Sequence, residues 1–307
     1  MALKVLFSTR TRLKFIGVPV VGLAVFSLFS RSSDTTGRRT LKSFDLGISC
    51  LPKSLTVPQL IKVAPCDCGE DSYAMIEKDG RILLAVADGV GSWRKKGINP
   101  ALFSRALCSY LRHAFLGSTN NASLVELIKE SFDSLVKDTL QANVGERPFG
   151  SSTVCAAILE GDEAKVANIG DSGLLLVRQG KVVFRTEVQQ HRFNAPFQLL
   201  HGPDGRIRDM TEKAQQANLK LQPGDVLMLA SDGVLDNVTE DELAVTVDRY
   251  ANMGAQRTAE LVAMQAWKQS LMAEKDSPFS QEARRHGIEH TGGKPDDITV
   301  LIAIYEK

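Results

Sequence analysis

The chain has 307 residues, of which 43% are hydrophobic and 24% are charged, and its formal net charge is +1. This composition is typical of a soluble globular protein, and the length permits one large domain or two smaller ones. The charge is unevenly divided, because residues 1–42 carry eight basic residues and one acidic residue, which leaves 29 basic and 35 acidic residues in the remainder. An acidic body argues against general nucleic-acid binding and is compatible with an enzyme that binds cations.

Residues 1–42 are expected to be a targeting segment, which leaves residues 43–307 as a single folded domain. Basic and hydroxyl residues dominate both ends of the segment and acids are nearly absent, as in mitochondrial transit peptides. The apolar stretch at residues 15–29 is shorter than the roughly 20 residues that span a bilayer, so we expect no stable membrane span. This stretch does match the apolar region of a secretory signal. The sequence therefore favours mitochondrial import, with secretion or membrane anchoring through residues 15–29 as the alternative.

From about residue 55 onward, strand and helix patterns follow one another. Residues 73–76 and 81–87 flank the turn Lys78-Asp79-Gly80, which predicts a β-hairpin. Asn99-Pro100 then supplies an N-cap followed by proline at the first helical position, ahead of apolar residues at helical spacing. A second apolar helical face runs over residues 124–140. The first half of the domain therefore contains a hairpin followed by two helices.

The second half begins with successive strands and ends with helices and a last strand. A helix is expected to begin at Thr239, because Glu242 three residues later completes a capping signature. Antiparallel strands segregated from paired helices predict an α+β fold in which two sheets pack face to face with helices outside, in one domain. The further elements expected are strands at 153–159, 165–168, 174–177, 182–184, 225–230 and 298–305, and helices at 239–250 and 257–274.

The five cysteines are an odd number for a disulfide framework. Cys155 lies in an apolar run typical of a strand and Cys108 in one typical of a helix. This pattern favours buried thiols in a reducing compartment, and the absence of a disulfide framework favours mitochondrial import over secretion. Cys66 and Cys68 are separated by one residue and lack the spacing of a zinc site. A metal or redox role for this pair is therefore not expected, and Cys50 is left as a thiol.

Four short acidic clusters carry the strongest functional signal: Glu70-Asp71, Asp88-Gly89, Asp232-Gly233 and Asp296-Asp297. Three of them adjoin an apolar run that is typical of a strand, and strand ends hold carboxylates rigidly. One Asp-Gly pair alone is commonly just a turn. Several converging carboxylates repel one another unless cations lie between them, which indicates a site for a hard metal ion with oxygen ligands. The sequence therefore predicts a metal-dependent hydrolase.

Six motifs in order resemble those of the type-2C (PPM) metal-dependent serine/threonine protein phosphatases, over about residues 64–305. The resemblance is closest to the mitochondrial branch of that family. It implies a four-layer α-β-β-α sandwich, two Mn²⁺ or Mg²⁺ ions, and hydrolysis of phosphoserine and phosphothreonine in phosphoprotein substrates through a metal-bridging water. The chain is expected to be a monomer that binds no nucleic acid. The motifs are Glu70-Asp71, Val86–Gly89, Gly150–Thr153, Asn168–Ser172, Ala230–Gly233 and Asp296–Val300.

The resemblance also implies roles for individual residues. Asp88 would bridge both ions, and Gly89 would offer its backbone carbonyl to one of them. Asp232 and Asp296 would complete the coordination of the other ion, and Asp88 and Asp232 would be the residues on which catalysis depends. Metals of this kind keep several waters, so few direct protein ligands are expected. The remaining two acids of the metal site, Glu70 and Asp71, would act largely through metal-bound waters.

Two positions depart from the pattern of the family. Val90 stands where many members have a histidine proposed as general acid, and Cys66 stands where many have a phosphate-binding arginine. Proton delivery and phosphate capture therefore have only candidates: Lys62, Arg94 and His191.

Two alternative functions stay open, the first because of these departures and the second because the same site could take another substrate. One is a pseudophosphatase that binds phosphoproteins without turnover, and the other is a hydrolase of small phosphate esters.

Asp171, in Gly170-Asp171-Ser172, is expected to order a loop near the metals rather than to bind them.

Overall fold

The computed structural model describes residues 44–55, 67–119, 122–141 and 147–306. They belong to one compact unit within residues 41–307. The predicted targeting segment and the candidate Lys62 lie outside the described residues, as does Cys66. Within the described ranges, no helix is both long enough and apolar enough to cross a bilayer.

Two five-stranded antiparallel sheets form the centre of the fold, as predicted. Successive side chains of a strand point to opposite faces of its sheet. In these two sheets both faces are buried, so neighbouring residues of a strand belong to different apolar clusters. The first sheet has the order β1 (Phe44–Leu51), β15 (Ile298–Tyr305), β14 (Val226–Ala230), β7 (Gly173–Arg178) and β8 (Lys181–Arg185). The second has the order β13 (Gln215–Lys220), β6 (Glu163–Ile169), β5 (Val154–Glu160), β3 (Arg81–Asp88) and β2 (Asp71–Lys78).

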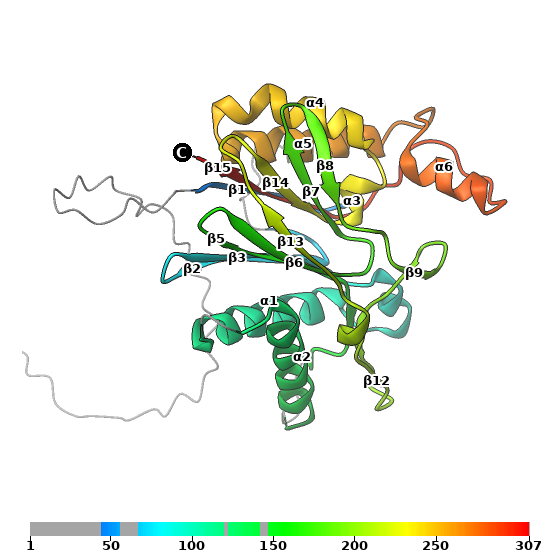
Figure 1. Cartoon of the computed structure of the whole chain (residues 1–307). Coiled ribbons are helices and arrows are strands. Elements are labelled where there is room, and N and C mark those ends of the chain that lie inside the picture. The colour runs from blue at the N-terminus through cyan, green and yellow to red at the C-terminus, as the bar shows by residue number, and fades with distance from the viewer. Residues whose placement is uncertain (1–43, 56–66, 120–121, 142–146, 307) are drawn as a thin grey trace, which may run out of the picture. The chain divides into compact units, whose positions relative to one another are not determined.

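Helices cover the outer face of each sheet (Figure 1). The first sheet is covered by α4 (Glu240–Tyr250) and α5 (Ala255–Ser270), and the second by α1 (Pro100–Gly117) and α2 (Leu124–Gln141). The predicted caps form: Asn99 Oδ1 accepts from the Ala101 N–H, and Thr239 makes a capping box with Glu242. Such caps satisfy backbone donors that a helix start leaves unpaired, so they fix where these two helices begin.

Three buried apolar clusters separate the four layers. Leu83 packs toward α1 and α2, whereas its neighbour Leu84 packs between the sheets. On the first sheet, Met228 packs toward α4 and α5, whereas Leu229 packs between the two sheets. The four-layer α-β-β-α sandwich is therefore confirmed, with helix, sheet, sheet and helix joined by three apolar interfaces.

Three parts of the fold were not predicted. The first is β1, which pairs along its whole length with β15 from Phe44↔Tyr305 to Leu51↔Ile298. The second is β13, which lies in the stretch between the strands expected at 182–184 and 225–230. The third is a set of short elements, most of them near the acidic end of the sheets, whose apolar patterns are too short to predict. These are the strands β4 (Gly150–Ser152), β9 (Gln190–Arg192), β10 (Ala195–Pro196), β11 (Leu199–His201) and β12 (Ile207–Arg208), the helices α3 (Asp232–Leu235) and α6 (Pro278–Arg285), and the 3₁₀ turns η1 (Gly91–Lys96), η2 (Thr211–Lys213) and η3 (Ala251–Met253).

Candidate metal centre

Asp88 is the last residue of β3, where the strand meets the start of β2. Its partner across the two strands is Asp71. The Asp88 carbonyl accepts hydrogen bonds from the Thr153 N–H at 3.0 Å and from Ser152 Oγ at 2.8 Å. The Asp88 N–H also donates to Thr153 Oγ1 at 3.2 Å. The backbone is therefore held on both sides of the carboxylate, so its position follows from the sheet.

Gly89 follows in a crowded turn. Its N–H donates to the Glu70 carbonyl at 3.2 Å. A Cβ at this position would lie 2.6 Å from the Glu70 carbonyl oxygen and 2.7 Å from that of Pro100, closer than real side chains approach. Glycine is therefore required by sterics at the position that the sequence assigned to a metal-binding carbonyl.

Asp232 opens the short helix α3 directly after β14, beside the start of β15. A Cβ on Gly233 would lie 2.1 Å from the Asp297 carbonyl oxygen, so the two segments approach too closely for any other residue. This contact explains the glycine that follows Asp232. The packing brings the β14 and β15 ends to the same edge as the β3 end.

Three carboxylates meet at this edge: Asp88, Asp171 and Asp232. One oxygen from each lies within 4.8 Å of the others. Among the described residues, the buried atoms Asp171 Oδ1 and Asp232 Oδ1 have no hydrogen-bond partner, nor does Asp71 Oδ2. Buried carboxylate oxygens without partners are costly unless a cation binds them. The residues present therefore fit a hard divalent metal ion.

The electrostatics of these acids agree with that fit. Burial, followed by repulsion from Asp232 and Asp71, raises the pKa of Asp88 well above its ordinary value. Burial, followed by the charge of Asp232, raises the pKa of Asp171 to about 8. Each shift reflects a cost of ionising the cluster, and a bound cation would remove that cost.

Asp171 is the main difference from the sequence prediction, which gave it only a loop-ordering role. Its side chain is 6% exposed, and Oδ2 accepts from Gln190 Nε2 at 3.1 Å. The other oxygen is unpartnered within the described residues, and one oxygen of the carboxylate lies within 4.8 Å of those of Asp88 and Asp232. The turn around Gly170, with φ of 115°, directs Asp171 inward, and the motif alone gave no orientation.

Asp296 lies next to the cluster but between two lysines. Lys53 Nζ lies 3.6 Å from one carboxylate oxygen, and Lys294 Nζ lies 3.4 Å from the other. The carboxylate of Asp296 contributes to the raised pKa of Asp88, so the two acids are electrostatically close. The structure does not group Asp296 with the three meeting carboxylates, and lysines occupy both of its oxygens.

Glu70 is buried and already paired. Lys53 binds one of its carboxylate oxygens and Arg94 binds the other. Arg94, a candidate for phosphate capture, thus has an acidic partner, although 60% of its side chain is exposed. Asp71 remains free at Oδ2, and burial, followed by the charge of Asp297, raises its pKa. Of the two acids predicted to act through water, only Asp71 has an unpartnered oxygen.

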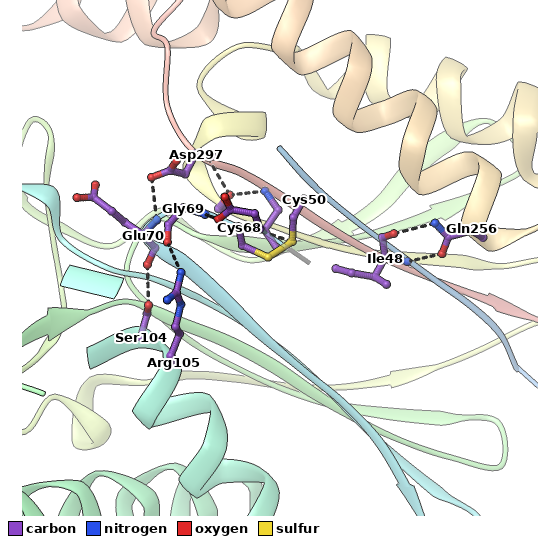
Figure 2. The surroundings of a disulfide bond; sticks show 12 residues. Ile48, Cys50, Cys68, Gly69, Glu70, Ser104, Arg105, Gln256 and Asp297 are labelled. Atoms are coloured by element: carbon purple, nitrogen blue, oxygen red, sulfur yellow. Dashed lines mark hydrogen bonds between the residues drawn. A yellow bond between two sulfur atoms is a disulfide. The ribbon is translucent and has the colours of Figure 1, made fainter. Parts of the chain in front are cut away.

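The loop that carries Glu70 is tied to the first sheet, as Figure 2 shows. Cys50 of β1 and Cys68 form a disulfide. The prediction that these cysteines are reduced thiols is therefore wrong, whereas Cys108 and Cys155 are buried free thiols as predicted. The error follows from the missed strand, because only the pairing of β1 with β15 brings Cys50 beside Cys68.

A cavity of about 890 Å³ opens beside the carboxylate cluster. Asp171 and Asp236 belong to its wall, and Phe193 and Phe279 line it farther out. The candidate His191 also lines this cavity, but its ring packs 4.5 Å from Phe197 and it is exposed. Of the three meeting carboxylates, Asp171 lines this cavity, together with residues of the β9–β10 turn and of α6.

Comparison with known proteins identifies the family. Residues 78–305 match the sequence profile of the Stage II sporulation protein E (SpoIIE) family. Over 268 residues the chain is 37% identical to "Protein phosphatase PTC7 homolog fig" of Drosophila virilis, covering 82% of this chain and 83% of that protein. "Protein phosphatase PTC7 homolog" of Homo sapiens is 34% identical over 257 residues, covering 80% and 82%. The chain belongs to the type-2C (PPM) family of metal-dependent protein phosphatases.

Solved structures agree with this assignment. The photosystem II phosphatase PBCP superposes with a TM-score of 0.69 at 31% identity, covering 85% of this chain and 98% of that one. The phosphatase Stp1 from Staphylococcus aureus gives 0.59 at 15% identity, covering 89% and 100%, and thus supports the fold alone. The predicted family and the predicted activity class, a metal-dependent serine/threonine protein phosphatase, are confirmed.

Proposed function

We propose that this phosphatase hydrolyses phosphoserine and phosphothreonine with Mn²⁺ or Mg²⁺ held by Asp88, Asp171 and Asp232. The observation that carries the proposal is the meeting of three carboxylate oxygens within 4.8 Å. Two further predicted ligands stay in the proposal as neighbours of these acids, the Gly89 carbonyl and Asp296. Asp71 and Glu70 keep an outer role, and the proposal retains the two ions that the family resemblance implies.

When bound, the cations would neutralise the phosphoryl oxygens and make a water nucleophilic near neutral pH. The contribution of the protein's own side chains is to hold the ligands in fixed positions. Asp88 is held by the β3 end, and Asp232 by the start of α3, so neither must reorganise when substrate arrives. The cavity of about 890 Å³, which Asp171 lines, is the proposed place for a phosphorylated segment. Two positively charged side chains near the cluster, Arg94 and Lys53, pair with Glu70 and hold it in place.

Replacing the proposed metal ligands tests the site. Asp88→Asn and Asp232→Asn should each lower Mn²⁺-dependent hydrolysis of a phosphothreonine peptide by at least about 100-fold, because each removes a charged ligand of nearly unchanged shape. Asp133→Asn, at an exposed position of α2, is the matched control and should retain full activity. Circular dichroism would verify that all three variants fold. Unchanged Mn²⁺-dependent turnover in both site variants would overturn the metal assignment.

The same purified protein separates the alternative functions. A pseudophosphatase would bind a phosphopeptide without releasing phosphate at any Mn²⁺ concentration. A small-ester hydrolase would turn over metabolite phosphates faster than phosphopeptides. The proposal expects phosphate release from the peptides, dependent on Mn²⁺ or Mg²⁺ and abolished by a chelator.

The proposed location is the mitochondrion, supported by the basic segment at residues 1–42 and by similarity to the PTC7 homologues. The Cys50–Cys68 disulfide removes one argument against secretion. A fluorescent fusion of the full chain should co-localise with mitochondria, and deletion of residues 1–42 should release it to the cytosol. Fluorescence in the secretory pathway would instead support the alternative.

A further inference from the structure

One lysine lies inside the acidic cluster. Lys294 Nζ lies 2.6 Å from Asp232 Oδ2, 2.7 Å from Asp236 Oδ2 and 3.4 Å from Asp296 Oδ2. The Lys294 side chain is only 16% exposed. Three carboxylate oxygens thus lie within 3.4 Å of one ammonium group, and carboxylate oxygens are also the ligands that hard divalent cations take.

The fold holds this lysine from several sides. Asn237 clamps its backbone: the Lys294 N–H donates to Asn237 Oδ1 at 2.8 Å, and Asn237 Nδ2 donates to the Lys294 carbonyl at 2.9 Å. The same amide group also donates to the Gly233 carbonyl at 2.9 Å. The Phe279 ring lies 5.0 Å from Nζ. Lys294 is therefore directed into the cluster, unlike a surface lysine whose long side chain stays solvated.

The contact divides the two oxygens of Asp232 between two tasks. Oδ2 accepts from Lys294, whereas Oδ1 is buried and has no hydrogen-bond partner among the described residues. Asp232 also contributes to the group of three carboxylates with Asp88 and Asp171. A carboxylate that is fixed through one oxygen presents the other oxygen in a defined direction. Hydrogen-bond partners commonly orient metal ligands in this way.

We infer that Lys294 is a positioning residue that takes a cation position between Asp232 and Asp236, orients Asp232 for the metal centre and keeps divalent ions out of that position. The inference rests on the proposed metal centre. A fixed ammonium there supplies one charge permanently. Loss of that charge would leave the carboxylates of Asp232, Asp236 and Asp296 without the cation between them, at a point where a divalent cation can bind.

The test counts bound metal ions. Full-length wild type, Lys294→Met and Lys294→Arg are titrated with Mn²⁺ by isothermal calorimetry. Lys294→Met should bind one more Mn²⁺ per chain than the wild type, and its kcat on a phosphopeptide should fall roughly 10- to 100-fold at saturating Mn²⁺. Lys294→Arg keeps the charge and should retain the wild-type number of ions.

A matched control is Lys275→Met. Lys275 is similarly buried, at 19% exposure, but it pairs with the single carboxylate Glu242. This variant should leave both the number of Mn²⁺ ions and kcat unchanged. Because a general loss of packing would affect both lysine variants, only the proposed role gives an added ion in Lys294→Met alone.

A second measurement uses the wild type and does not depend on the folding of a variant. Anomalous scattering from Mn²⁺-soaked crystals should place no ion between Asp232 and Asp236. An ion at that point, or an unchanged ion count in folded Lys294→Met, would overturn the inference. Failure of the wild type to bind any Mn²⁺ would instead overturn the proposed function, so the two failures are distinguishable.

Discussion

The replacement Asp297→Asn should destabilise the protein strongly although Asp297 is not a proposed metal ligand. Its carboxylate is 3% exposed and joins two segments far apart in sequence. Oδ1 accepts from the Lys53 N–H at 2.8 Å, and Oδ2 accepts from the Glu70 N–H at 3.0 Å (Figure 2). A Cβ on Gly69 would overlap this side chain, so the loop is built around it.

Asparagine keeps the shape but can accept at only one of the two positions. One hydrogen bond to a charged group is lost, worth roughly 1.5–3 kcal/mol, and one buried N–H then faces an NH₂ donor, which costs about 1–3 kcal/mol more. We therefore expect the free energy of unfolding to fall by roughly 3–5 kcal/mol. For a domain of this size the melting temperature should fall by roughly 6–20 °C.

The assay is urea denaturation of the full-length chain followed by circular dichroism, with thermal melting as a second measure. Asp67→Asn is the control, because Asp67 accepts from the Gly69 N–H in the same loop but is exposed. It should cost less than about 1 kcal/mol. A loss below about 1 kcal/mol for Asp297→Asn as well would refute the view that this carboxylate holds the loop.

Three other measurements probe features elsewhere in the fold. Removing the disulfide, in a Cys50→Ala/Cys68→Ala variant, should lower the free energy of unfolding by about 3 kcal/mol, and dithiothreitol should then have no further effect. Arg178→Ala should lower the free energy of unfolding by about 3–5 kcal/mol, because Asp225 is 1% exposed and loses an ion pair with two hydrogen bonds. An unchanged free energy of unfolding would contradict this. Without metal, the free energy of unfolding should fall as pH rises from about 4 to about 8. Burial raises the pKa of Asp171 to about 8 in the folded state. Over that range the folded chain therefore binds more protons than the unfolded chain, and raising the pH favours unfolding. Mn²⁺ should therefore raise the melting temperature more at pH 8 than at pH 6, and equal shifts would argue against this account.

The sandwich was predictable because its strands and long helices carry regular patterns over many residues. The apolar face of residues 124–140 became α2, and the capping signature at Thr239 marked the first turn of α4. Strand β1 was missed because residues 44–51 alternate only weakly and stand next to the basic segment. That omission had a further effect, since the position of Cys50 depends on the pairing of β1.

The candidate acids of the metal centre were predicted from motif order, whereas their contacts were not. Asp88 and Asp232 meet as expected. The inward direction of Asp171 depends on the backbone at Gly170. The contacts of Lys294 with Asp232 and of Lys53 with Asp296 join chain segments more than 50 residues apart. Side-chain pairing over such separations leaves no mark in the sequence of one chain. The contacts of Lys53 and Lys294 with the acids therefore required the structure.

The disulfide has a consequence for the integrity of the polypeptide. Cys50 and Cys68 bracket residues 51–67, so a protease that cuts once inside this interval produces two fragments that stay covalently joined. Strand β1 would remain paired with β15 after such a cut, and everything before it would remain attached to the domain. Under reducing conditions the same cut would leave only strand pairing and side-chain packing to retain β1. A nicked chain should therefore migrate as one band on a non-reducing gel and as two on a reducing gel.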